Sequence, residues 1–182
     1  MADLCDSQHF TVEDGYHLPS VVFLFGLAGA GKNFCAEVLA RRFRYESYDL
    51  DHHITPAMRT AIADGQSFTD EMRDEFFAVV RSEIAELLQR YPRLILHQGA
   101  YKERHRIAIR SAYPAIEFVW VTAPQEMIVQ RLMQRGTPVS AEYAAAIAKN
   151  FEPPEPLAKV LVNDTSCEQE LAMRFVSLFK KT

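Results

Sequence analysis

Residues 21–32 have the sequence Val21-Val22-Phe23-Leu24-Phe25-Gly26-Leu27-Ala28-Gly29-Ala30-Gly31-Lys32. The first five form a continuous apolar run of β-favouring residues, which predicts a buried central strand. The remainder fits the pattern G-x-x-x-x-G-K, in which glycines let the backbone curl so that its N–H groups point at a phosphate. Apolar residues then recur near helical spacing as far as Phe43, so a helix N-terminus with its partial positive charge follows the loop. This succession predicts a nucleotide-binding protein.

The glycine-rich loop is the candidate nucleotide site. Lys32 is expected to reach the outer phosphates of a nucleotide such as ATP. The next residue is Asn33, where Ser or Thr normally supplies a hydroxyl to Mg²⁺. Two alternatives follow: either Mg²⁺ is held mainly by carboxylates, phosphates and water, with the Asn33 amide oxygen as a ligand, or nucleotide binds with impaired chemistry. The expected cofactor-binding residues of the loop are Gly26, Ala28, Gly29, Ala30, Gly31, Lys32 and Asn33.

The composition is that of an ordinary folded protein. Of the 182 residues, 48% are hydrophobic and 24% are charged, and the formal charge is −4. We therefore expect one domain that binds no nucleic acid. No run approaches the roughly 18 apolar residues of a membrane span, and the acidic start lacks the apolar core of a secretory signal. The three cysteines lie far apart, which favours a reduced, cytoplasmic setting.

Apolar runs alternate with stretches of helical period along the rest of the chain. This alternation predicts an α/β fold with a parallel sheet of five strands, covered by helices on both faces. Residues 1–19 are expected to form an N-terminal extension, either a small hairpin or a tail, and residues 20–182 a single domain. We expect His97 in the core and His105 on a helix surface. Beyond residues 21–43, strands are predicted at 45–49, 94–97, 116–121 and 159–162, and helices at about 69–91, 102–111, 124–136, 140–150 and 168–180.

Two carboxylates follow the second predicted strand. In the run Asp49-Leu50-Asp51, strand alternation points both acidic side chains the same way. The carboxyl ends of the strands in such a sheet face the ligand crevice. One carboxylate is therefore a candidate to hold metal-bound water, and the other to accept the proton of an attacking hydroxyl.

These segments together resemble the shikimate kinase and gluconate kinase group of P-loop small-molecule kinases. The resemblance rests on Gly29-x-Gly31-Lys32, on Tyr48-Asp49-Leu50-Asp51, and on Ala100-Tyr101-Lys102-Glu103-Arg104-His105-Arg106, which is closer to gluconate kinases. It implies a three-layer P-loop NTPase fold of the nucleoside-monophosphate-kinase kind, with a small helical lid around residues 131–150. It also implies transfer of the γ-phosphoryl of ATP to a hydroxyl of a small carboxylated acceptor.

The same resemblance implies roles for individual residues. Asp51 would orient or deprotonate the acceptor hydroxyl, Asp49 would lie near Mg²⁺, and Arg73 would grip the acceptor carboxylate. Arginines of the lid would close over the phosphates, with a basic helix C-terminus as the alternative interpretation. A charged, solvated helix face is the alternative for the two basic residues after the third strand. The remaining expected residues are Gly99, Lys102 and Arg106 for the acceptor, and Arg131 and Arg135 for the lid, with Arg131 also catalytic.

Two departures leave the acceptor open. Gly136-Thr137-Pro138-Val139 stands where gluconate kinases carry a Lys-Gly-His-Phe-like run, and Gln98-Gly99-Ala100 stands where shikimate kinases carry three glycines. A gluconate-like sugar acid is the favoured acceptor and a shikimate-like ring the second. The alternative functions are a nucleotide-binding pseudokinase with an impaired metal site and a nucleotide or nucleoside kinase. Both a monomer and a homodimer are compatible with the sequence.

Overall fold

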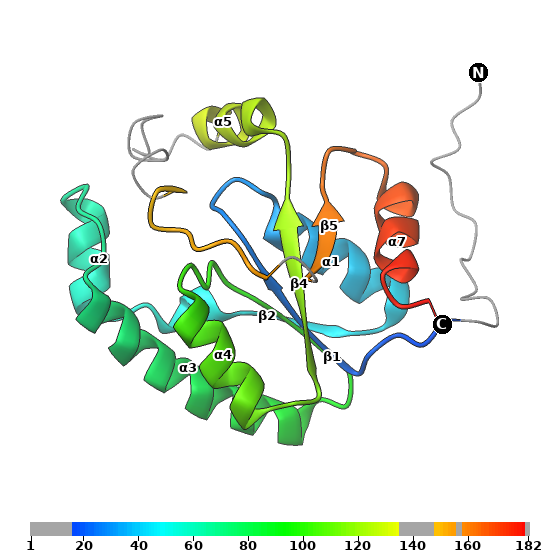
Figure 1. Cartoon of the computed structure of the whole chain (residues 1–182), viewed down its shortest axis with the longest axis horizontal. Coiled ribbons are helices and arrows are strands. Elements are labelled where there is room, and N and C mark those ends of the chain that lie inside the picture. The colour runs from blue at the N-terminus through cyan, green and yellow to red at the C-terminus, as the bar shows by residue number, and fades with distance from the viewer. Residues whose placement is uncertain (1–15, 135–147, 156–157, 181–182) are drawn as a thin grey trace.

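The computed structural model describes residues 16–134, 148–155 and 158–180. Its five strands form one sheet in the order β2-β3-β1-β4-β5, and every neighbouring pair is parallel (Figure 1). The predicted three-layer α/β fold is thereby confirmed. The elements in chain order are β1 (Val21–Phe25), α1 (Lys32–Phe43), β2 (Glu46–Asp49), the 3₁₀ helix η1 (Leu50–His53), α2 (Pro56–Ala63), α3 (Asp70–Arg90), β3 (Leu94–His97), α4 (Glu103–Ala112), β4 (Ile116–Thr122), α5 (Gln125–Gln134), β5 (Lys159–Val162) and α7 (Glu168–Ser177).

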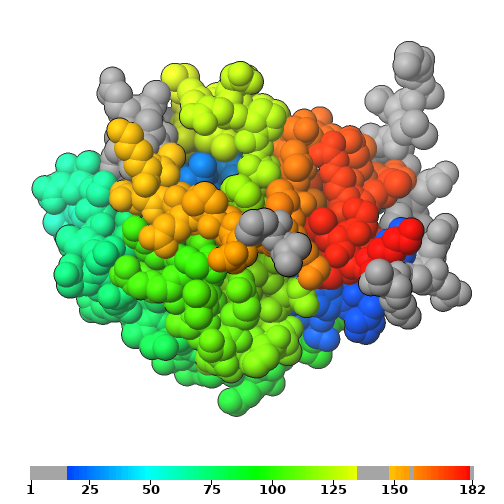
Figure 2. Space-filling view, in the orientation of Figure 1, coloured from blue at the N-terminus to red at the C-terminus, as the bar shows by residue number. Residues whose placement is uncertain are grey.

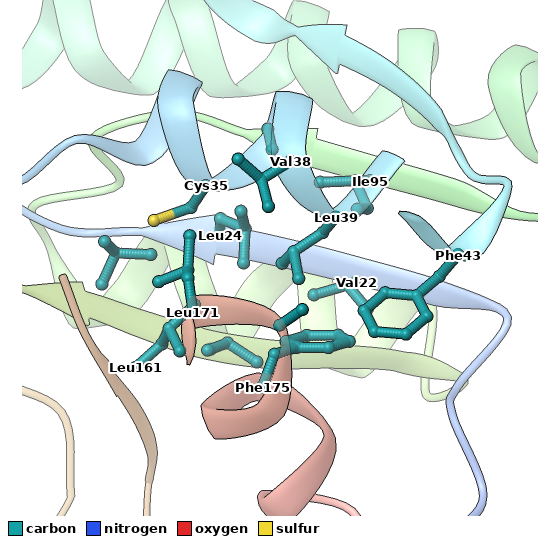
Figure 3. Close-up of a cluster of buried hydrophobic side chains, with 14 of the residues drawn as sticks. Val22, Leu24, Cys35, Val38, Leu39, Phe43, Ile95, Leu161, Leu171 and Phe175 are labelled. Atoms are coloured by element: carbon teal, nitrogen blue, oxygen red, sulfur yellow. The ribbon is translucent and has the colours of Figure 1, made fainter. Parts of the chain in front are cut away.

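Strand β1 lies in the middle of the sheet and is buried along its whole length. Its alternate side chains enter two separate cores, as a strand covered on both faces requires. Val22 and Leu24 pack toward α1 and α7, where Phe175 and other apolar side chains of those helices meet the sheet (Figure 3). Phe23 and Phe25 pack on the other face, against α3 and α4. Because all five strands are parallel, their carboxyl ends lie at the same edge of the sheet, where the phosphate loop follows β1.

Two short elements between β2 and α3 were not expected from the sequence. η1 and α2 occupy residues 50–63, and Thr55 caps α2 by accepting a hydrogen bond from the N–H of Met58. Pro56 is the first residue of α2, a position that proline favours. The local signals for α2 were present, but the helix has only eight residues, which is too short for a clear apolar period.

One of the two histidine expectations is confirmed and the other is wrong. His97 is buried in the core, as expected. His105 is also buried, although we expected it on a helix surface, because its ring stacks on Phe77 with 4.2 Å between the ring centroids. Several predictions fall outside the described residues. They are the hairpin or tail before residue 16, the role of Arg135, and the parts of the predicted lid and helix between residues 135 and 147.

The first and last described segments meet at the end of the sheet opposite the phosphate loop. Tyr16 forms an isolated antiparallel bridge with Lys180, and the N–H of His17 donates to the carbonyl of Phe179 at 3.2 Å. Within the described part of the chain, no helix is both long and apolar enough to cross a membrane.

Candidate active site

The phosphate loop has the backbone conformation that its glycines permit. Gly29 and Gly31 have φ values of 84° and 88°, in the left-handed region that side chains disfavour. A Cβ atom at Gly31 would also lie 2.0 Å from the side-chain nitrogen of Asn163. The ammonium group of Lys32 donates to the carbonyl oxygens of Gly26 and Leu27, both at 3.1 Å. The lysine therefore lies folded over its own loop.

Two side chains from later segments of the chain bind the phosphate loop. Asn163, which follows β5, is buried and donates to the carbonyl of Ala30 at 2.8 Å. The guanidinium of Arg131 on α5 donates to the same carbonyl at 3.4 Å and to the carbonyl of Asn163 at 3.1 Å. Arg131 thus contacts the phosphate loop, and its role as a lid arginine stays a prediction. The sequence analysis missed Asn163, although a polar residue at the carboxyl end of a strand is a signal for the ligand edge.

A hollow of about 400 Å³ adjoins this contact and includes Gly31, Phe34, Arg131 and Thr165 in its lining. In Figure 2, blue surface from the early part of the chain shows at the bottom of an opening between α5 and the segment 148–155. The phosphate loop belongs to that part of the chain. The loop is therefore reached from the carboxyl edge of the sheet.

The two carboxylates lie together but not on one strand. Asp49 ends β2, and Asp51 lies in η1, where its N–H donates to Asp49 Oδ1 at 2.9 Å. The 3₁₀ turn replaces the strand alternation that we expected. Gln98, which follows β3, donates to Asp51 Oδ1 at 3.1 Å, and the amide of Asn33 donates to Asp49 Oδ2 at 3.3 Å. His97 Nδ1 lies 3.8 Å from Asp49 Oδ1.

The surroundings shift the pKa of two of these groups. Asp51 has an exposed side chain, yet protein atoms crowd its carboxylate, and this crowding, with the negative charge of Asp49, raises its pKa. Lys32 and the Gln98 hydrogen bond partly offset the shift. Burial lowers the pKa of His97 despite the nearby Asp49. A raised pKa brings the carboxylate of Asp51 closer to the range in which it can accept a proton at neutral pH.

The residues present fit a magnesium ion of the kind that accompanies ATP. The described residues contain no group of three or more His, Cys, Asp or Glu side chains placed to hold a metal. Mg²⁺ does not need such a cage, because it usually keeps several waters and binds one or two protein oxygens together with substrate phosphates. The carboxylate of Asp49 is one such oxygen donor, and the neighbouring Asn33 amide presents its nitrogen to that carboxylate.

A cavity of about 250 Å³ lies beside the phosphate loop. Lys32 and Asp51, two of the three expected catalytic residues, line it together with Gln98, whereas the third, Arg131, lines the neighbouring hollow. Arg73 and Gly99, two of the expected acceptor residues, also line it. The guanidinium carbon of Arg73 lies 5.5 Å from the centre of the Phe68 ring and 5.9 Å from that of Tyr101.

Tyr101 joins the cavity to the phosphate loop. Its hydroxyl oxygen accepts a hydrogen bond from the N–H of Ala28 at 3.0 Å. The preceding Ala100 has a φ of 42°, and the side chain of Gln98 accepts a hydrogen bond from its N–H. The segment 98–101 is therefore held against both Asp51 and the loop.

The structure corrects the expectation that Arg106 binds the acceptor. Its side chain is completely buried, pairs with Glu103, and donates to the carbonyls of Ala100 and Glu152, both at 2.6 Å. Lys102 pairs with the Glu152 carboxylate at 3.1 Å. Neither basic residue lines the cavity, which is formed in part by the segment 98–101, whereas His105 of α4 does line it. Arg106 instead fastens that segment to residue 152.

Residues 21–154 match the model of a protein family described as an AAA domain. The chain belongs to this AAA-domain family. One curated relative of the AAA domain is an adenylyl-sulfate kinase of Gloeothece citriformis, 29% identical over 138 residues, covering 73% of this chain and 78% of the relative. Another is a shikimate kinase of Neisseria meningitidis serogroup C, 29% identical over 113 residues, which are 60% of this chain and 63% of that enzyme.

A solved structure shares the fold of the AAA domain over most of its length. The gluconokinase of Sinorhizobium meliloti 1021 superposes with a TM-score of 0.73 and 18% sequence identity, covering 88% of this chain and 91% of that one. The phosphate loop and the carboxyl edge of the sheet therefore belong to a fold that P-loop kinases share. The expected likeness to the gluconate and shikimate kinase group is confirmed.

Proposed function

We propose that the protein is an ATP-dependent kinase that transfers the γ-phosphoryl group to a hydroxyl of a small carboxylated acceptor. The observation that carries the proposal is that Lys32 of the phosphate loop, Asp51 and Arg73 line one cavity. A phosphate-binding cation, a candidate base and a candidate carboxylate ligand are thus within one small space. The relatives named above are kinases of small molecules, which supports the proposal.

The phosphate loop binds and orients the nucleotide in this proposal. Backbone N–H groups at the start of α1 and the ammonium of Lys32, released from the carbonyls of Gly26 and Leu27, hold the phosphates. Asn33 and Asp49 would hold Mg²⁺, which neutralises charge on the phosphate oxygens when it is bound. Arg131 extends from α5 to the loop and is placed to add positive charge at the transferred group, while the hollow lined by Phe34 and Thr165 receives the nucleoside.

Asp51 is the base. It takes the proton from the acceptor hydroxyl while that oxygen forms a bond to the γ-phosphorus and the bond to the ADP oxygen breaks. The hydrogen bond from Gln98 fixes the orientation of its carboxylate, and the raised pKa suits a group that must gain a proton and lose it again. Arg73 binds the acceptor carboxylate at another wall of the cavity.

The resemblance seen in the sequence favours a gluconate-like sugar acid as the acceptor first and a shikimate-like ring second. Release of ADP from Mg-ATP, measured separately with gluconate, shikimate, adenylyl sulfate and nucleosides, tests the proposal. Turnover that depends on one acid and disappears in Lys32→Met supports it. Turnover with nucleosides alone would make the protein a nucleoside kinase.

The metal site gives the one alternative that a specific contact favours. The amide of Asn33 donates to Asp49, so its nitrogen faces the carboxylate that is expected near the metal. A pseudokinase would bind ATP and release no ADP with any acceptor, in the native chain and in Asn33→Ser alike. Activity that appears only in Asn33→Ser would identify the metal site as the defect. A cytoplasmic location and a monomeric or dimeric state stay predictions.

A further inference from the structure

The acceptor cavity has one extended apolar wall, beside which the hydroxyl-bearing Ser67 also lines the cavity. That wall is built from six side chains, hereafter the apolar wall, that come from the end of η1, from α2, from the loop before α3 and from α3 itself. Two of them, Phe76 and Phe77, are buried and meet edge to face with 5.1 Å between their ring centroids. The members of the apolar wall are Ile54, Met58, Ile62, Phe68, Phe76 and Phe77.

Several of the polar side chains around the cavity already have partners. Gln98 donates to Asp51 and accepts from Ala100, and the hydroxyl of Tyr101 accepts from Ala28. These bonds take up part of the hydrogen-bonding capacity of both side chains.

His105 contributes a neutral, flat ring rather than a charge. Its Nε2 lies 2.7 Å from a carboxylate oxygen of Asp74, and its ring stacks on Phe77. Burial lowers its pKa, and the positive charges of Arg104 and Arg73 act in the same direction, whereas Asp74 opposes them. The imidazole is therefore uncharged at pH 7; it lines the cavity beside Phe77, and its buried Nδ1 has no hydrogen-bond partner among the described residues.

An open-chain sugar acid matches such a cavity poorly. Each ligand hydroxyl that is buried against the apolar wall without a partner lowers affinity roughly 5- to 150-fold. An apolar ring gains from the same contact, because it removes apolar surface of both partners from water. The volume of about 250 Å³ is at the small end of ligand cavities and suits one ring with few substituents.

We infer that the acceptor is an alcohol with a flat, apolar body of the size of a benzene ring and a single anionic group. Its ring lies against the apolar wall, its hydroxyl lies at Asp51 and its anion at Arg73. The inference rests on the proposed function for the reaction, but the preference for an aryl body concerns binding and is measurable without turnover.

Two hydroxymethylbenzoates and one sugar acid serve as probes. With the full chain and Mg-ATP, 3- and 4-(hydroxymethyl)benzoate are compared with gluconate for kcat/KM by ADP release, and for Kd by calorimetry. We expect at least one aryl acid to exceed gluconate by 10-fold or more in both. Removing the carboxylate, as in benzyl alcohol, should abolish the sensitivity of Kd to Arg73→Met.

Two exposed apolar side chains form a matched pair of variants. Ile62 belongs to the apolar wall and is 41% exposed, whereas Val79 on α3 is 43% exposed and does not line the cavity. Ile62→Asn should weaken binding of the aryl acid about 10-fold and leave gluconate unchanged or improved. Val79→Asn should change neither, and both exposed positions tolerate a polar residue.

The outcomes separate the two proposals. If gluconate is phosphorylated more efficiently than every aryl acid, the inference is wrong and the proposed function stands. If an aryl acid binds selectively but no ADP is released, the inference stands and the proposed function is wrong. Equal, weak binding of both classes refutes the inference whatever the turnover.

Discussion

Replacing Arg106 by methionine tests whether this buried cation is structural. Methionine approximates the length of the arginine stem but removes the charge and all five donors. The partners left behind are the Glu103 carboxylate and the carbonyls of Ala100 and Glu152. The guanidinium also packs against aromatic rings, 4.9 Å from the centre of Phe25, and methionine retains part of that contact.

The expected loss of stability follows from the groups that Arg106→Met leaves without a partner. Removing one partner of a buried ion pair costs about 3–5 kcal/mol, since the other charge stays buried. Glu103 keeps 24% of its side chain exposed, so water partly solvates it and the lower end applies to this pair. The two carbonyls that lose a donor add about 1 kcal/mol each. We expect a total of about 5 kcal/mol, which lowers Tm by roughly 10–20 °C in a protein of this size.

The assay is urea and thermal unfolding of the native chain and three variants. Arg104→Met is the matched control, because Arg104 lies two residues away on α4, is 45% exposed, and pairs with Asp70 and Asp74 at the surface, where such pairs contribute about 0–1 kcal/mol. Adding Glu103→Gln to Arg106→Met should recover part of the loss. If Arg106→Met costs less than about 1 kcal/mol but raises the acceptor KM 10-fold, Arg106 is a ligand and this reasoning is wrong.

Three further predictions concern the reaction. Lys32→Met should lower kcat for ADP release roughly 10²–10³-fold, because a donor to the phosphates is lost, with folding checked by an unchanged Tm. Activity should fall as pH falls through the pKa of Asp51, which lies above the ordinary value of about 3.9. Asp49→Asn removes a negative charge that raises this pKa, so the acidic limb of the kcat/KM profile should move to lower pH. An acidic limb that does not move would contradict the assignment of Asp51 as the base. Gly31→Ala should abolish measurable ATP binding in calorimetry, because the added Cβ meets Asn163 at 2.0 Å and φ is 88°; binding within 10-fold of the native chain would show that the loop adapts.

The elements nearest the phosphate loop could be predicted because their signals are local. The bounds of β1, α1, β3 and β5 agree with the apolar runs and with the helical spacing after Lys32. β1 and β3 are buried along their whole length, and glycines bound β1 at its end and α1 at its start. The doubly covered sheet then follows from the alternation of strands and helices.

Residues on α4 could not be assigned from the sequence, because the helix has few apolar residues to mark its buried face. Ile109 is buried whereas Ile107 is 50% exposed, so the spacing of isoleucines indicates no single face. His105 and Arg106 find partners in Asp74 and in the carbonyl of residue 152, which come from other segments, and in Glu103 of α4 itself. The contact between Arg106 and the carbonyl of Glu152 joins residues 46 positions apart, so a local sequence pattern does not indicate it.

The chain contains one tryptophan, Trp120 on β4. Its indole stacks on Phe151, with 5.9 Å between ring centroids, and its ring edge adjoins Gly26 at the start of the phosphate loop. Phe151 in turn contacts Tyr101, whose hydroxyl accepts from Ala28. Excitation at 295 nm therefore observes a single fluorophore placed between the two substrate sites. The native protein thus carries its own optical probe, and titrations with nucleotide or acceptor need no attached dye.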